Sequence, residues 1–164
     1  MLIHQSTWKG RRFKMVENTD GDFVFLGNAR LKDQEKLMEK ILEDGVCPFC
    51  PENLAKYHKE EILKTGEHWT LTYNQWPYRN TKLHLLAIAR YHARCLSDLK
   101  PGAAEELFDL LRWAEITYNV AFGGVCMRFG DVKNNGATVD HLHAHFIVPM
   151  PNLSKDEKVR FKIS

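Results

Sequence analysis

The chain has 164 residues, which is enough for one domain with a buried core that does not depend on disulfides. Hydrophobic residues make up 44% of the sequence and charged residues 27%, a composition that excludes disordered and fibrous proteins. The formal net charge of +2 is too small for a nucleic-acid scaffold, so we expect no stable complex with nucleic acid. The sequence has neither an apolar secretory segment at its start nor a run of about 18 apolar residues, and we expect a cytoplasmic protein that does not enter a membrane.

A hairpin and a helix are predicted in the N-terminal region. Asp20-Gly21 is a typical hairpin turn, and apolar residues lie on both sides of it within residues 12–27. From Asp33 to Asp44, apolar residues recur at helical spacing, and Gly45 follows as a stop signal. This helix leads directly into the first cysteines.

Two strands and one long helix are predicted in the middle of the chain. Trp69–Tyr73 and Leu83–Ile88 are rich in β-branched and aromatic residues, which favours strands. A helix is predicted to open near Ser97-Asp98, because apolar residues then recur at spacings of three and four up to Tyr118. A polar stretch runs from Cys50 to Lys64, and Pro51-Glu52-Asn53 at its start is a candidate helix start.

The last third of the chain carries further strand patterns. Val125–Phe129 and Val139–Val148 are typical of strands, Asn134–Gly136 of a turn, and Val159–Ile163 of a final edge strand. Strands and helices do not alternate regularly, so we expect an α+β fold with a largely antiparallel sheet in a single domain. The expected parts of this domain are residues 1–46 with the hairpin and helix, a core of residues 47–150, and a tail of residues 151–164.

Three histidines occupy alternate positions of one predicted strand, namely His141, His143 and His145. Alternate residues of a strand share a face, so the three rings should form one wall while Leu142 and its alternate neighbours pack into the core. A single histidine in a strand is usually structural, but three rings that repel one another when charged point to a function. Spacing alone leaves open that the three rings together bind a catalytic zinc.

The run His141-Leu142-His143-Ala144-His145-Phe146-Ile147 resembles the signature of the histidine-triad (HIT) superfamily, which is His-x-His-x-His followed by apolar residues. The lead-in Gly136-Ala137-Thr138-Val139 and the upstream segments His84–His92 and Leu96–Leu99 are similar to other passages of this family. The resemblance extends over residues 47–148 and implies a HIT-like fold.

In this family the middle histidine attacks the α-phosphorus of a nucleotide and carries the nucleotidyl group, a role that the resemblance assigns to His143. Neutral imidazole suits this chemistry because it is nucleophilic and a fair leaving group from phosphorus. The resemblance further implies that His145 contacts the phosphate or leaving group and that His84 supports the catalytic rings from behind. Main-chain amides from Gly136 to Thr138 are expected to donate to nonbridging oxygens.

Asn74-Gln75-Trp76-Pro77-Tyr78 resembles the Asn-x-x-Pro-Tyr passage of zinc-containing dinucleoside polyphosphate hydrolases and phosphorylases in this superfamily. That passage borders the base and ribose, which implies nucleotide contacts for Asn74, Trp76 and Tyr78. Stacking of Trp76 and Tyr78 on a base and burial of both rings in the core remain alternatives.

The chain departs from the family pattern at two places. Arg128-Phe129-Gly130-Asp131 stands where many members carry Asn, and Ala137 stands at the position of a Gln. Arg128 is a candidate for bidentate contact with a phosphate, and Asp131 is a candidate for contact with ribose hydroxyls. These departures leave open the leaving group and the acceptor, which is water, phosphate or a sugar phosphate.

Cys47-Pro48-Phe49-Cys50 has the spacing of a zinc knuckle or of a redox dithiol. A thioredoxin-like unit needs a strand before the pair, whereas a helix and Gly45 precede it here, so zinc is favoured over a dithiol or a plain structural loop. A closed zinc site needs two more ligands, and His4, His58 and His68 are candidates. Of these, His58 lies in a polar stretch and is expected to face solvent.

The resemblance to zinc-containing members, and more distantly to hexose-phosphate uridylyltransferases, implies that His92 and His141 complete a structural zinc site with Cys47 and Cys50. Two thiolates and two neutral imidazoles balance the charge of the ion. Such a site would pin a loop against the catalytic strand without performing chemistry.

These patterns together predict a nucleotide hydrolase or nucleotidyl transferase with a covalent nucleotidyl-histidine intermediate. Its expected substrates are dinucleoside polyphosphates or related nucleotides. The alternative is a zinc-stabilised nucleotide-binding module without catalysis. By analogy with the family, we expect a homodimer.

Overall fold

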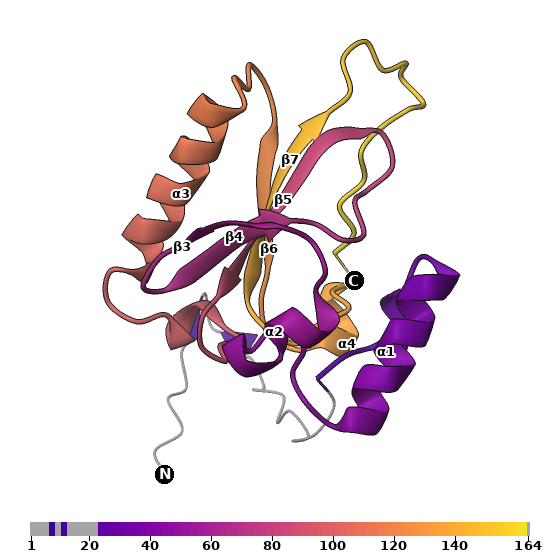
Figure 1. Ribbon diagram of the computed structural model, residues 1–164, viewed down its shortest axis with the longest axis vertical. Helices are drawn as coiled ribbons and strands as arrows, with labels where there is room; N and C mark the ends of the chain where they lie inside the picture. The colour runs from indigo at the N-terminus through magenta and orange to yellow at the C-terminus, as the bar shows by residue number, and fades with distance from the viewer. Residues whose placement is uncertain (1–6, 9–10, 13–22, 164) are drawn as a thin grey trace.

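A five-stranded antiparallel sheet lies at the centre of the computed structural model, which describes residues 7–8, 11–12 and 23–163 (Figure 1). Its strand order is β3-β4-β5-β7-β6, and every neighbouring pair is antiparallel. The strands are β3 (Ile62–Thr65), β4 (Trp69–Tyr73), β5 (Thr81–Ala89), β6 (Gly124–Arg128) and β7 (His143–Pro149), and a separate short pair is formed by β1 (Thr7–Trp8) and β2 (Arg11–Arg12). The predicted α+β class is confirmed.

Helices flank the sheet on two sides. The α-helices are α1 (Lys32–Asp44), α2 (Pro51–Tyr57), α3 (Ala103–Thr117) and α4 (Val132–Asn135), with short 3-10 turns at Leu26–Asn28 and Leu96–Asp98. In Figure 1, α3 lies on one side of the sheet, and α1, α2 and α4 gather on the other. Among the described residues, none of the helices has the length and apolar character that crossing a membrane requires.

The main core lies between α3 and the sheet. Leu107, Leu111 and Ala114 of α3 pack with Trp69 and Leu85 of the strands, and all five are buried. Leu142, Ala144 and Phe146 also belong to this cluster, which confirms that the residues alternating with the histidines face the core. The histidines therefore face the opposite side of the sheet.

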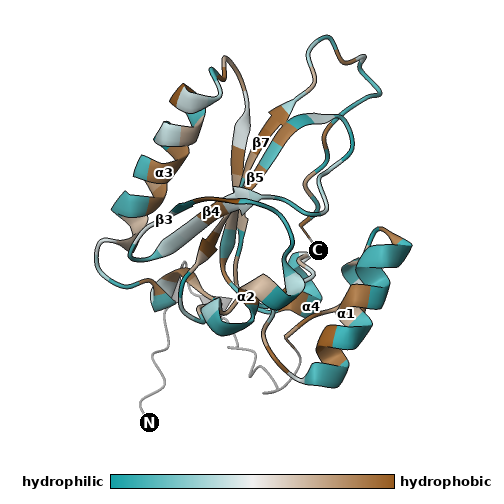
Figure 2. Ribbon diagram, in the orientation of Figure 1, coloured by the Kyte–Doolittle hydropathy of each residue, from teal (hydrophilic) through white to brown (hydrophobic). Residues whose placement is uncertain are grey.

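The helix α1 is amphipathic and covers the histidine side. Figure 2 shows hydrophilic residues along much of α1, interrupted by hydrophobic ones. Met38 and Ile41 are buried against Tyr57 and Val139 in a second apolar cluster. The helix ends at Gly45, whose φ of 61° is the left-handed conformation that glycine adopts without strain, so the predicted stop is confirmed. The hairpin turn predicted at Asp20-Gly21 lies outside the described residues.

The strand predicted over 139–148 begins later than expected, at His143. Long-range contacts hold residues 139–142 in a loop: the Asp140 amide donates to the Phe23 carbonyl, and the Leu142 amide donates to the Ala93 carbonyl. The buried Asp140 carboxylate also pairs with Arg94. His141 consequently lies ahead of the strand, outside the ladder that holds the other two triad histidines.

Two further expectations are wrong in the described structure. His58, which follows α2, is 7% exposed rather than solvent-facing, and the stretch 50–64 around it contains α2 and β3. Its Nε2 lies 2.8 Å from the Thr72 hydroxyl, which satisfies the buried ring. Residues 159–163 form no edge strand, because the Lys162 carbonyl accepts from the Arg128 side chain instead of a neighbouring strand.

Candidate functional site

The ladder of β7 brings His143 and His145 to the middle of the sheet. His143 is paired with Ile88 of β5 and with Arg128 of β6, and His145 lies two residues further along the same face. The two ring centroids are 5.0 Å apart, and both side chains are buried. The alternation of the strand thus sets two imidazoles side by side.

A backbone carbonyl sets the tautomer of His143. Its Nδ1 lies 2.6 Å from the His141 carbonyl oxygen and therefore carries the proton that it donates there. Burial, and to a lesser degree the nearby Arg128, lowers the pKa of His143 to about 4, against the opposing effect of the bond to His141. At neutral pH the ring is neutral and keeps a lone pair on Nε2.

A chain of hydrogen bonds orients His145. The Tyr78 amide donates to Nδ1 of His84 at 3.1 Å, so neutral His84 carries its proton on Nε2. That nitrogen is 2.9 Å from Nδ1 of His145 and donates to it, which leaves the proton of His145 on Nε2. Burial, followed by the charges of Arg30, His143 and Arg128, lowers the pKa of His84 to about 3. This series of hydrogen bonds therefore ends in one N–H donor, Nε2 of His145.

Arg128 brings a second donor to the same point. Its Nη1 is 3.4 Å from Nε2 of His145, its Nη2 donates to the Tyr78 hydroxyl at 3.1 Å, and its Nε donates to the Lys162 carbonyl at 2.7 Å. Two N–H groups that face each other cannot bond to each other, but both can donate to one anion. An anionic oxygen is the complement of this pair.

A pocket opens in front of the two histidines. Most of the predicted nucleotide-binding residues line it together with His143 and His145, namely Asn74, Trp76, Tyr78, Arg128, Gly136 and Thr138. The structure does not bring Asp131 to this wall; its carboxylate accepts from the Lys133 amide and the Asn134 side chain at the start of α4. The Ala137 amide is also engaged, since it donates to the Asn135 side chain. His84 lies behind His145.

Residues from both ends of the chain complete the pocket. Gln34, Leu37, Met38 and Ile41 of α1 line it, as do Arg30, Phe49, Arg160 and Lys162. No sequence pattern assigned these residues to the site. Helical periodicity revealed an apolar face on α1, but nothing local indicated that this face meets the histidine strand.

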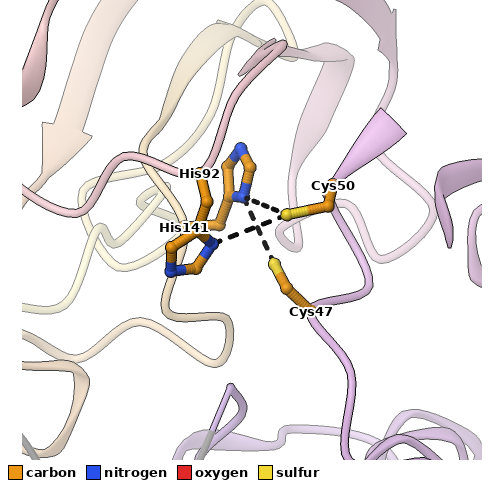
Figure 3. Close-up of side chains that lie close together, drawn as sticks. All are labelled: Cys47, Cys50, His92 and His141. Carbon is orange, nitrogen blue, oxygen red and sulfur yellow. Dashed lines mark hydrogen bonds between the residues drawn. The ribbon is translucent and has the colours of Figure 1, made fainter. Parts of the chain in front are cut away.

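Four donors converge beside the pocket: Cys47, Cys50, His92 and His141 (Figure 3). Their ligand atoms all lie within 4.8 Å of one another, with 3.3 Å from Cys47 Sγ to His141 Nδ1 and 3.6 Å from Cys50 Sγ to His92 Nδ1. Tetrahedral zinc, with bonds of about 2.0 to 2.3 Å, places sulfur and nitrogen about 3.5 Å apart. The cluster resembles a closed zinc site.

The surroundings of the cluster suit a cation. Nε2 of His141 donates to the Ala89 carbonyl at 2.7 Å, which leaves Nδ1 free to ligate. Burial raises the pKa of Cys47 to about 12 and also raises that of Cys50, so the thiols need a positive partner to ionise.

The other candidate ligands lie elsewhere. His58 contacts Thr72, His68 lies against Tyr91, and His4 is outside the described residues. In the part of the chain that the structure describes, the four-residue cluster is the one group of metal-ligating side chains that was found. The three triad histidines do not converge on one point, because His141 faces the cysteines while the other two line the pocket.

The antiparallel sheet, the paired imidazoles and the adjoining Cys2His2 cluster define an α+β protein with a histidine-lined site. The chain belongs to the HIT domain family, whose sequence model matches residues 58–152. Some residues that line the pocket lie outside the matched range: those of α1 precede it, and Arg160 follows it.

Several solved structures have a similar fold. One is a Zn-bound histidine triad family protein from Mycobacterium smegmatis, with TM-score 0.51, 20% identity, and coverage of 72% of this chain and 82% of that chain. A hypothetical protein from Leishmania major has TM-score 0.53 and 24% identity, with coverage of 72% of this chain and 79% of that chain. A histidine triad nucleotide-binding protein from Candida albicans has TM-score 0.54 and 15% identity, with coverage of 71% of this chain and 86% of that chain. No curated protein matches the sequence.

Proposed function

We propose that the protein is a nucleotide hydrolase or nucleotidyl transferase that attacks an α-phosphate with Nε2 of His143. The observation that carries this proposal is the bond from Nδ1 of His143 to the His141 carbonyl, which leaves the Nε2 lone pair at the pocket wall. A neutral, oriented imidazole is a competent nucleophile towards phosphorus.

The transfer proceeds in two displacements. The Nε2 lone pair forms a bond to phosphorus, the bond from phosphorus to the leaving oxygen breaks, and its electron pair departs with the leaving group. The acceptor oxygen then attacks the same phosphorus, loses its proton to solvent, and returns the electron pair of the N–P bond to His143. The N–H of His145 and the guanidinium of Arg128 donate to the phosphate oxygens throughout.

The substrate is proposed to contact Asn74, Trp76 and Tyr78 on one side and the loop with Gly136 and Thr138 on the other. All of them line the pocket. Dinucleoside polyphosphates or related nucleotides are the proposed substrates, with water as acceptor in hydrolysis and phosphate or a sugar phosphate in transfer. Two structural neighbours are described as a nucleotide-binding protein and as a HIT family hydrolase, which is consistent with this class.

Zinc is the metal that we propose for Cys47, Cys50, His92 and His141. The donor set is neutral when zinc is bound, and all four positions are filled by protein, so the metal is structural. It would tie the loop after α1 to His141, two residues before β7, and so help to place His143. Cysteines kept reduced as ligands agree with the cytoplasmic location that we propose.

Trapping the intermediate tests the proposed function. Nucleotides labelled at the α-phosphate are incubated with the protein and quenched in alkali, where a phosphoramidate bond survives. We expect label on His143, its loss in acid, and release of a nucleoside monophosphate or its transfer to phosphate or a sugar phosphate. Nucleotide binding without label or product would contradict the enzyme and favour the zinc-stabilised binding module. A His143→Asn variant that still becomes labelled would exclude this nucleophile.

A homodimer is also proposed. The strand β6 lies at an edge of the sheet, and the neighbouring Phe122 and Val125 are 52% and 50% exposed. An unpaired edge with apolar side chains favours association. Light scattering during gel filtration, repeated with Val125→Lys, checks whether this edge holds two copies together.

A further inference from the structure

The pocket has two ends of different chemistry. At the end near His143, the ring of Phe49 packs edge-on with a centroid distance of 5.3 Å, and the apolar residues Leu37, Met38 and Ile41 continue this wall. At the end near His145, the lining residues are cationic. A substrate bound at His143 therefore meets an apolar surface on one side of the phosphorus and positive charge on the other.

Two cations lie at the end near His145, and two more line the same pocket. Arg30 lies 4.5 Å above the Tyr78 ring, which stacks on His145 at 5.7 Å, and Arg128 lies beside the same histidine. The side chains of Arg160 and Lys162 also line the pocket, and no lining residue of the described chain is an Asp or Glu. The positive field is therefore uncompensated within the pocket wall.

The tail segment, residues 159–163, is held in this position by contacts with the catalytic residues. The Phe161 ring centroid lies 3.6 Å from the Arg128 guanidinium carbon and 5.2 Å from the His145 ring. The Lys162 carbonyl accepts from Arg128, while its ammonium donates to Asn28 at 3.3 Å and retains further donors. Figure 1 shows the chain returning from the end of β7 to finish near α4. The segment is thus part of the site, although it lies outside the family match.

We propose that Arg160 and Lys162, placed by Phe161, form the subsite for the leaving group and select leaving groups that carry phosphate. The assignment rests on the proposed function, because it takes His143 as the point of attack. The nucleoside then occupies the apolar end, and the leaving group extends past His145 into the cationic end. Neutral leaving groups such as amines gain nothing from this charge.

The state of His145 agrees with a phosphate-bearing leaving group. Burial and the neighbouring charges of His143, His84, Arg128 and Arg30 lower the pKa of His145 well below its ordinary value. The substrate-free ring is therefore a neutral donor that can stabilise an anion but is a poor source of a full proton. Phosphate chains depart as stable anions without that proton, whereas an amine has to be protonated as it leaves.

The experiment compares two adenylates that differ in the leaving group. Diadenosine tetraphosphate has an anionic leaving group, and adenosine 5′-phosphoramidate has a neutral one. The variant Arg160→Gln/Lys162→Gln removes two charges and keeps the backbone contact to Arg128. Its control, Lys155→Gln/Lys158→Gln, removes two exposed charges of the same tail that do not line the pocket.

We expect the first variant to lower kcat/KM for diadenosine tetraphosphate about tenfold, as two partly exposed charge pairs imply, and to change the phosphoramidate rate little. The control variant should retain the wild-type ratio of the two rates. Equal losses with both substrates, or an unchanged ratio in the first variant, would overturn the assignment.

Calorimetry with inorganic tripolyphosphate separates this assignment from the proposed function, because it needs no turnover. Weaker binding, by about tenfold, in the Arg160→Gln/Lys162→Gln protein alone supports the subsite even if neither adenylate reacts. The same affinity in the wild type and both variants would exclude it. Absence of turnover and of labelled protein would count against the proposed function alone.

Discussion

His141 and His143 lie two residues apart, yet their rings serve different sites. The Ala89 carbonyl accepts from Nε2 of His141, so Nδ1 faces the cysteines. The carbonyl of His141 itself accepts from Nδ1 of His143, so Nε2 faces the pocket. Both pKa values are lowered to about 4, mainly by burial. The difference teaches that the position of one backbone carbonyl decides which lone pair of a buried histidine is available.

Removing a cysteine should have the largest effect, because the metal cluster that contains His141 stabilises the fold itself. We expect Cys47→Ser to abolish stoichiometric zinc binding and to lower Tm by at least about 10 °C, since structural zinc can contribute ~10 kcal/mol. Elemental analysis and thermal unfolding measure the two effects. Cys95→Ser, at a half-buried thiol outside the cluster, is the control and should change neither. Full zinc content in Cys47→Ser would disprove the ligand set.

Exchanging the two neighbouring histidines in turn tests the comparison directly. His143→Asn should lower kcat by at least about 10³-fold while zinc content and Tm stay near wild type, because the lost lone pair forms the covalent bond. His141→Asn should lose zinc and lower Tm, because a metal ligand is removed. The two variants are compared by elemental analysis, thermal unfolding and steady-state kinetics. If both lost zinc, or if His143→Asn remained active, the division of roles would be wrong.

A smaller effect is expected at His84, which positions His145 without lining the pocket. His84→Ala should lower kcat about 10- to 100-fold with little change in KM, because the donor chain to His145 is broken. His84→Gln retains an N–H donor and should recover part of the loss. Steady-state kinetics give both values. A loss as large as that of His143→Asn would show that His84 touches the reacting atoms.

The smallest effect concerns His58, a buried imidazole that bonds to the Thr72 hydroxyl at the edge of the pocket and is not part of the metal cluster. Burial lowers the pKa of His58 below the ordinary value of 6.5. The unfolded chain therefore binds a proton first on acidification, so stability is full above pH 6.5 and falls as the pH drops below it. We expect His58→Gln to reduce this slope by at most about 1.4 kcal/mol per pH unit. Urea unfolding at pH 7.5 and 5.5 measures it; an unchanged slope would indicate that His58 ionises in the folded protein.

Short-range patterns were sufficient for much of the fold and for the two cysteines of the metal cluster. The strands at 69–73 and 125–128 follow from residue type, and α1 ends at the expected glycine. The helix at 103–117 follows from apolar spacing, although it begins after the predicted start near Ser97-Asp98. Cys47 and Cys50 share one loop, and His92 and His141 were inferred from the family resemblance. The structure brings these four donors together, although β7 begins two residues after His141 rather than before it.

The sequence by itself determined which side chains of the strand can do chemistry, because the spacing of His143 and His145 sets one face. Only the tertiary structure decided which ring nitrogen each histidine exposes, since the partner carbonyls depend on how separate segments pack. It also decided that α1 and the tail line the pocket, that His58 is buried, and that Asp131 caps a helix. These outcomes depend on contacts between residues far apart in the chain, such as Arg128 with Lys162, which no local periodicity encodes.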